Sequence, residues 1–128
     1  MPSQATGIPG ISIEHVGQPE VLIFSIVGQV PQEHFSRAAE AFRELIQQGR
    51  HRRVVIDLSE ADYISSTGIG AAVYYQKYLE RHHGKLVIVK GPPAVMKVVV
   101  PLIQSVIQIA ETREEAVASL RDFQERCG

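Results

Sequence analysis

The chain has 128 residues, of which 45% are hydrophobic and 21% are charged. This length and composition suit one domain with a single hydrophobic core and exclude a largely disordered chain. The 13 basic and 14 acidic residues give a net charge of −1. Because there is no block of one sign and no apolar run of transmembrane length, neither a nucleic-acid partner nor direct membrane insertion is expected.

The N-terminal part of the sequence predicts a lead-in, a hairpin and a helix. Residues 1–10, rich in Pro, Gly and Ser, predict a flexible lead-in to a single domain over residues 11–126. Strands are expected over 11–15 and 20–27, joined as a hairpin by a Gly- and Pro-containing turn. A helix over 31–49 follows, with an apolar stripe made of Phe35, Ala38, Phe42, Leu45 and Ile46, and Gly49 as its C-terminal cap.

The remaining sequence alternates strands with helices. Strands are predicted over 53–58, 85–89 and 106–109, and helices from the Ser66-Thr67 turn to about His83, over 93–100, and over 112–123. For 93–100 the many valines leave a strand open as an alternative. Such alternation is typical of an α/β domain with a mostly parallel sheet, mixed here by the N-terminal antiparallel hairpin, and about four helices.

The stretch from Asp57 to Gly70 joins a buried strand to a helix through three consecutive hydroxyl residues. The first N–H groups of a helix lack intrahelical partners, so Ser66 or Thr67 is expected as the N-cap. Three hydroxyls followed by Gly68 are more than a cap needs. A phosphoryl group here would add about −1.5 to −2 of charge where N–H donors point outward, so the residues suit a phosphorylation switch.

The pattern Asp57-Leu-Ser, then Ser65-Ser66-Thr67-Gly68-Ile69-Gly70, resembles the signature of STAS domains, in particular of anti-sigma factor antagonists. The resemblance extends from about Ile11 to the C-terminal helix. It implies a STAS-like fold and a cytoplasmic regulator of transcription that works by partner switching. In this family, a serine-kinase anti-sigma factor phosphorylates the hydroxyl before the glycine, which weakens binding, and a PP2C-type phosphatase reverses the reaction. That hydroxyl corresponds to Thr67, with Ser66 as second choice, and the resemblance also allows a homodimer.

The expected partner-binding surface comprises the hydroxyl turn and two aromatic residues on the following helix. The turn contributes Ser65, Ser66, Thr67 and Gly68. Tyr74, Tyr75 and Tyr78 cannot all face the core, and exposed aromatic side chains often mark contact surfaces. Tyr74 and Tyr75 are therefore assigned to the partner-binding surface.

Ser65 departs from the family pattern, which has an acidic residue at this position. Replacement of the acidic residue by serine would remove like-charge repulsion against a phosphate on the neighbouring hydroxyl. It would equally remove a carboxylate that the kinase needs for contact. The sequence leaves both consequences open. The alternative function is therefore a STAS docking subunit that is not phosphorylated, in an ABC lipid transporter or a larger sensory complex.

Neither an enzyme nor a cofactor or metal site is expected. The segment Gly68-Ile-Gly70 lacks the third glycine of a dinucleotide fingerprint. Asp57 and Asp62 are interpreted as strand-end and loop carboxylates, not as a catalytic pair. His82 and His83 project about 100° apart on a helix and have no partner pair at metal-ligand spacing.

Overall fold

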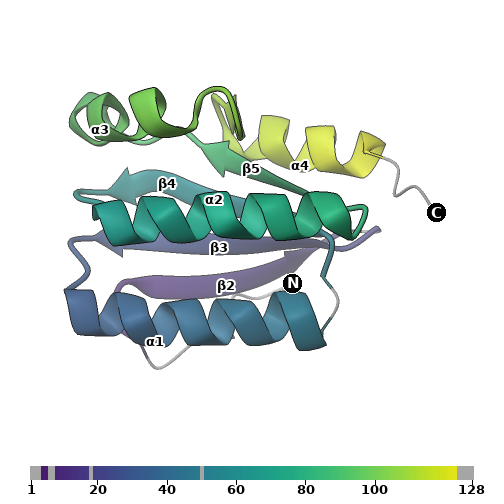
Figure 1. Cartoon of the computed structure of the whole chain (residues 1–128), viewed down its shortest axis with the longest axis horizontal. Helices are drawn as coiled ribbons and strands as arrows, with labels where there is room; N and C mark the ends of the chain where they lie inside the picture. Colours follow the sequence, from purple (N-terminus) through teal and green to yellow (C-terminus); the bar gives the residue numbers. More distant parts are fainter. Residues whose placement is uncertain (1–3, 6–7, 18, 50, 124–128) are drawn as a thin grey trace.

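The computed structural model describes residues 4–5, 8–17, 19–49 and 51–123 and shows a mixed sheet with helices on both faces (Figure 1). The strands are β1 (Gln4–Ala5), β2 (Ile11–Val16), β3 (Val21–Gly28), β4 (Arg53–Ala61), β5 (Lys85–Val89) and β6 (Gln108–Ala110). The helices are α1 (Gln32–Arg43), continued by the π-helical turn η1 (Glu44–Gln48), then α2 (Ser66–Arg81), α3 (Pro93–Ile103) and α4 (Arg113–Asp122). Residues 124–126 of the predicted domain lie outside the described residues.

The sheet has the order β1-β2-β3-β4-β5-β6. The hairpin β2–β3 is antiparallel, whereas β3, β4, β5 and β6 pair in parallel, which confirms the predicted mixed α/β fold. Strand β1 was not predicted. It pairs antiparallel with β2, and Ile8 beyond it is buried, so this part of the expected flexible lead-in belongs to the fold.

Helices α1, α2 and α3 cover one face of the sheet, and α4 covers the other. The alternation of side chains along β4 accounts for the two layers. Val54, Ile56 and Leu58 belong to the larger core beneath the three helices, whereas Val55 belongs to the smaller core beneath α4. In Figure 1, α1 and α2 lie side by side across the sheet.

The predicted helix 31–49 is confirmed, with differences at both its ends. Pro31 is the N-cap of α1, and Gly49 is the C-cap of η1, as predicted, with an ordinary helical φ of −78°. Its N–H donates to the carbonyl of Glu44, because the chain widens into η1 before it ends. Within the predicted stripe, Ala38, Phe42 and Ile46 are buried, Leu45 packs against them, and the side chain of Phe35 lies outside the described part.

Each of the parallel strands β3, β4 and β5 is followed directly by a helix on the same face. The starts of α1, α2 and α3 therefore lie at the carboxyl edge of these strands, which is where α/β sheets commonly bind ligands. Among the described residues, no helix has both the length and the apolar character that crossing a bilayer requires.

Candidate functional site

The junction between β4 and α2 is held against the neighbouring strand. The N–H of Asp62, just after β4, donates to the carbonyl of Gly28 at the end of β3, at 2.9 Å. Gly28 has a φ of +71°, which glycine adopts without strain. Ile64 then enters the larger core, so the hydroxyl turn begins from two anchored residues.

Ser65 is the N-cap of α2. Its backbone is extended, with φ −82° and ψ 160°, and its Oγ accepts a hydrogen bond of 3.1 Å from the N–H of Gly68. The predicted cap at Ser66 or Thr67 is therefore wrong by one or two residues. The reason is geometric, since a cap must remain extended while its oxygen reaches the N–H three residues ahead.

Ser66 and Thr67 occupy the first turn of α2, and both are exposed. The cap hydrogen bond is made by Ser65, so neither of these hydroxyls is needed for it. The first turn of α2 contains no acidic residue. A negative group placed here would thus meet the positive end of a 16-residue helix without a like charge in the same turn.

One exposed face of α2 continues from this turn. Thr67, Gly70 and Tyr74 are spaced by three and four residues, so they lie on the same side of the helix. Tyr74 is 52% exposed, and among the described residues a Cβ on Gly70 would meet no atom within 4 Å outside the neighbouring backbone of α2. The fold itself does not require a glycine at position 70, and its lack of a side chain leaves the helix backbone open to close approach.

Tyr75 does not belong to this face, which corrects its assignment to the partner-binding surface. It is only 6% exposed, its ring centroid lies 4.9 Å from that of Phe42, and its hydroxyl donates to the carbonyl of Ala39 at 3.5 Å. Burial raises the pKa of Tyr75, and Tyr74 adds to the rise. The ring therefore packs against α1 in the core and is not available to a partner on the exposed face of α2.

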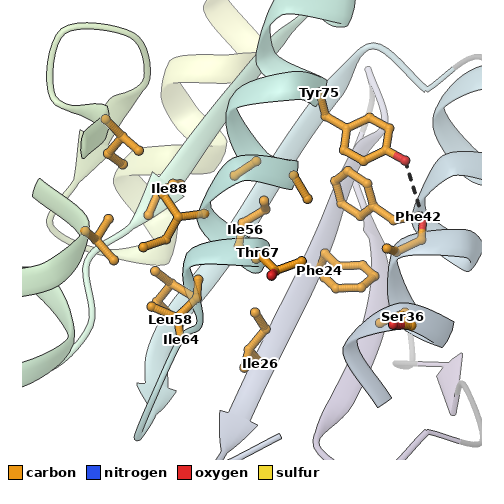
Figure 2. Close-up of a pocket in the computed structure, with 18 residues that line it drawn as sticks. Phe24, Ile26, Ser36, Phe42, Ile56, Leu58, Ile64, Thr67, Tyr75 and Ile88 are labelled. Atoms are coloured by element: carbon orange, nitrogen blue, oxygen red, sulfur yellow. Dashed lines mark hydrogen bonds between the residues drawn. The ribbon is translucent and has the colours of Figure 1, made fainter. Parts of the chain in front are cut away.

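An apolar cavity of about 340 Å³ lies beside the hydroxyl turn, between α1 and α2 (Figure 2). Thr67 and Gly68 form part of its wall, and Phe24 and Ile26 of β3 lie on the sheet side. The other lining residues are Ser36, Ala38, Ala39, Phe42, Ile56, Leu58, Ile64, Ile69, Ala71, Ala72, Tyr75, Ile88, Val99 and Ile103. The exposed residue Thr67 therefore lies at the border of an apolar cavity.

Asp57, the first residue of the signature, serves the other face of the sheet. Its carboxylate is buried and accepts hydrogen bonds from Nε and Nη2 of Arg113, at 3.0 and 2.9 Å, and from the N–H of Ser59 at 2.9 Å. Arg113 also contacts Glu14 at 2.8 Å and the hydroxyl of Ser25 at 3.1 Å. This network holds the start of α4 to three strands, and it was not foreseen from the sequence.

Asp57 and Asp62 are accordingly in different surroundings. Burial works to raise the pKa of Asp57, but hydrogen bonds from Ser59 and Arg113 outweigh it and hold the pKa below its usual value. Asp62 is exposed in the loop before α2. The carboxylate of Asp57 is thus committed to an ion pair beneath α4 rather than directed toward the hydroxyl turn.

Comparison with known proteins gives consistent matches. The STAS domain family model matches residues 12–116. A Bordetella bronchiseptica protein named "Putative anti-sigma factor antagonist BtrV" is 30% identical over 102 residues, which cover 79% of this chain and 87% of that protein.

Solved structures extend the likeness to the fold. The anti-sigma factor antagonist SpoIIAA in its unphosphorylated form superposes with a TM-score of 0.73 at 19% identity, covering 88% of this chain and 98% of that one. The Bacillus cell fate determinant SpoIIAA in its phosphorylated form gives a TM-score of 0.70 at 19% identity, covering 87% and 99%.

Proposed function

Since the chain belongs to the STAS domain family, we propose that it acts as an anti-sigma factor antagonist switched at the start of α2. In its unmodified form it binds a serine-kinase anti-sigma factor through Ser65, Ser66, Thr67 and Gly68, together with Tyr74. The partner phosphorylates Thr67, with Ser66 as second choice, and a PP2C-type phosphatase restores the binding form. Its activity is binding and not catalysis, and its place is the cytoplasm, where sigma factors act.

The observation that carries the proposal is the exposure of the Thr67 side chain on the first turn of α2. A kinase must bring the hydroxyl oxygen to the γ-phosphate of ATP, so a buried hydroxyl would be excluded. Ser65 supplies the cap, and Thr67 is therefore available for modification without loss of the helix start. The relative BtrV carries the name of an anti-sigma factor antagonist, which supports the choice of partner class.

Phosphate on Thr67 would change the contact face more than the fold. The group adds about −1.5 to −2 of charge at neutral pH, and the positive end of the α2 dipole stabilises it there. On the same face lie Gly70 and Tyr74, so a partner packed on them would have to accommodate both the bulk and the charge. Desolvating such a charge in an interface without a cationic partner is costly, which favours release.

The cavity beside Thr67 supports a partner that inserts an apolar side chain next to the switch residue. Interfaces commonly place such an anchor in a pocket surrounded by polar contacts. In this chain the pocket wall includes Thr67 and Gly68 themselves. Binding of the anchor and modification of the hydroxyl would then compete for the same place.

The test uses the purified chain, a serine-kinase anti-sigma factor from the same genome, and Mg-ATP, with intact-mass and peptide mass spectrometry. We expect one phosphoryl group on Thr67. The Thr67→Ala variant should lose it, whereas Ser66→Ala and the exposed control Ser105→Ala should retain it. Phosphate on neither Thr67 nor Ser66 would reject the switch.

Binding measurements separate the switch from constitutive docking. Phosphorylated protein should bind the kinase at least about tenfold more weakly than unmodified protein, and Thr67→Glu should be weakened in the same direction. Equal affinity of the modified and unmodified forms would contradict the proposal. Recovery of an ABC transporter or sensory complex by Thr67→Ala and by the unaltered chain alike would favour the docking subunit instead.

A further inference from the structure

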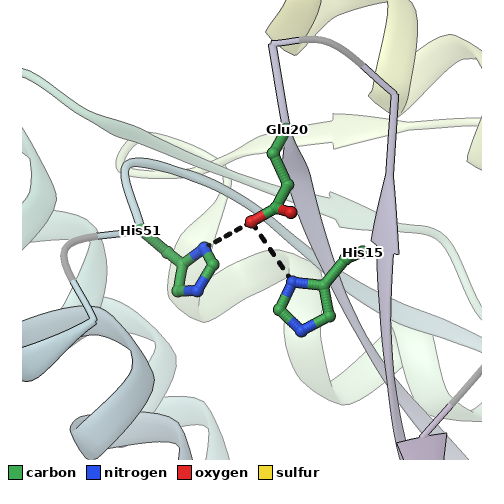
Figure 3. Close-up of side chains that lie close together, drawn as sticks. All are labelled: His15, Glu20 and His51. Carbon is green, nitrogen blue, oxygen red and sulfur yellow. Dashed lines mark ion pairs between the residues drawn. The ribbon is translucent and has the colours of Figure 1, made fainter.

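A second cluster of side chains, made of His15, Glu20 and His51, is drawn in Figure 3; it lies where β3 and β4 begin, whereas the hydroxyl turn lies beyond the end of β4. His15 stands near the end of β2, Glu20 in the turn before β3, and His51 in the connection that enters β4. Figure 3 shows a nitrogen of each ring directed at the Glu20 carboxylate. The side chains of His15 and His51 are only 18% and 17% exposed, so the rings are held largely within the protein.

The spacing of the three ligand atoms is that of a small coordination site. Nδ1 of His15 and Nδ1 of His51 lie 3.2 and 3.3 Å from the same oxygen, Oε1 of Glu20. One ligand atom from each of the three residues can be chosen so that all lie within 4.8 Å of one another. In a tetrahedral zinc site with metal–ligand distances of about 2.0–2.1 Å, neighbouring ligand atoms are about 3.3–3.4 Å apart. The two separations between ring nitrogen and carboxylate oxygen, 3.2 and 3.3 Å, are close to that value.

The donor set selects among metals. Two imidazole nitrogens with one carboxylate oxygen suit Zn²⁺, whereas Mg²⁺ and Ca²⁺ prefer oxygen ligands. Three protein ligands leave a fourth position for water, and the half-exposed carboxylate of Glu20 provides access from solvent. The neighbouring guanidinium of Arg52 is held by the backbone, because its Nη1 donates to the carbonyls of Ile46 and His51.

We propose that His15, Glu20 and His51 form a Zn²⁺ site with water as the fourth ligand. The metal would link the β2–β3 turn to the segment that leads from η1 into β4. These segments are distant in sequence. A shared metal would hold them together where β3 and β4 begin, at the opposite end of these strands from the proposed switch. The inference does not depend on the proposed function.

The same geometry could be a hydrogen-bonded cluster without metal, in which both rings donate to Glu20. Only the metal site predicts saturable binding of one zinc ion. The test uses the full chain without a histidine tag, freed of metal by a chelator that is then removed. Zn²⁺ and, separately, Mg²⁺ are titrated by calorimetry, and Co²⁺ is added to follow the visible absorption of a tetrahedral site.

We expect one Zn²⁺ per chain, a rise in Tm with zinc, and no such effect of Mg²⁺. The variants His15→Gln and His51→Gln should each lower the zinc affinity by at least about tenfold, the loss that even outer-shell partners of metals produce. His82→Gln removes an exposed histidine outside the cluster and should leave the affinity unchanged. A wild-type chain without saturable zinc binding, or variants that bind zinc as it does, would overturn the proposal.

Discussion

At the residue scale, Ser65 caps helix α2 at the position where the family pattern has an acidic residue. Its Oγ satisfies the N–H of Gly68, so Ser65→Ala should lower the free energy of unfolding by about 1 kcal/mol. Ser65→Asp should stay within about 0.5 kcal/mol of the unaltered chain, because aspartate caps equally well and its charge suits a helix start. Urea unfolding at pH 7 measures both, with the exposed Ser105→Ala as control; equal stability of Ser65→Ala and the unaltered chain would refute the role of the cap.

Gly70 offers a second residue-scale prediction, one that separates folding from binding. An added methyl group would meet none of the described residues beyond the neighbouring backbone of α2, and alanine favours a helix over glycine by about 1 kcal/mol. Gly70→Ala should therefore raise Tm while it weakens binding of the anti-sigma factor, if the partner packs on the face of Thr67 and Tyr74. Thermal unfolding and calorimetric binding test the two halves; Glu114→Ala, at an exposed position of α4 on the other face of the sheet, serves as the control for binding. Unchanged affinity of Gly70→Ala would remove Gly70 from the contact face.

The sequence located the hydroxyl turn but not the separate tasks of its residues. Three adjacent hydroxyls are each acceptable as a cap, and only the extended backbone at Ser65 identifies the one used. The tyrosines pose the same difficulty, since Tyr74 and Tyr75 are neighbours and their opposite exposure depends on the rotation of α2 against α1. The positions of three tyrosines along one helix required at least one exposed ring, but they could not identify which tyrosine it is.

At the scale of elements, the chain leaves α2 through a left-handed backbone position that is occupied by a histidine. Helix α2 ends at Arg81, and His83 just after it adopts the left-handed conformation, with φ +65°, which is favourable for glycine. His83→Gly should therefore raise the free energy of unfolding by about 1 kcal/mol. Gly84→Ala should lower it instead, because a Cβ there would lie 2.6 Å from the carbonyl oxygen of Arg52. Denaturant unfolding of both variants is the measurement, and a destabilised His83→Gly would contradict the account.

Helix α3 illustrates why some elements could not be assigned from propensity alone. Its valines allow a strand, and Pro101 interrupts the pattern. The structure resolves the choice because Val95, Met96, Val99 and Ile103 are the positions buried, at helical spacing. The N–H of Gln104 still donates to the carbonyl of Val100, so the helical pairing continues past the proline.

At the scale of the whole molecule, Arg113 joins parts of the chain that local patterns cannot relate. The guanidinium reaches Glu14 on β2, Ser25 on β3 and Asp57 on β4, and it starts the helix that covers this face. Periodicity predicted each of these elements separately. The pairing of Glu14 with Arg113 follows only from the order of strands in the sheet. The same is true of the cluster of His15, Glu20 and His51, which the sequence analysis did not foresee.

This ion pair should make the stability of the molecule depend on acidity. The pKa of Asp57 is lower in the folded chain, since hydrogen bonds from Ser59 and Arg113 outweigh the effect of burial. The unfolded chain therefore binds a proton first, at a pKa of about 3.9. The contribution is complete well above that pKa, and it is lost as the pH falls through it and through the folded value.

The variant Asp57→Asn isolates this contribution. At pH 7 it should lower the free energy of unfolding by about 2 kcal/mol, because it removes the more buried of the two carboxylates that pair with Arg113 and leaves only Glu14. The loss in the free energy of unfolding of Asp57→Asn should shrink between pH 5 and about pH 3, measured by urea unfolding at each pH.

Burial also lowers the pKa of His51, which reduces stability as the pH falls below about 6.5. This effect is the same in Asp57→Asn and in the unaltered chain, so it does not change the difference between them. Asp62→Asn, in the exposed loop, should follow the unaltered chain at every pH, and a constant deficit for Asp57→Asn would show that the charge of Asp57 does not stabilise the fold.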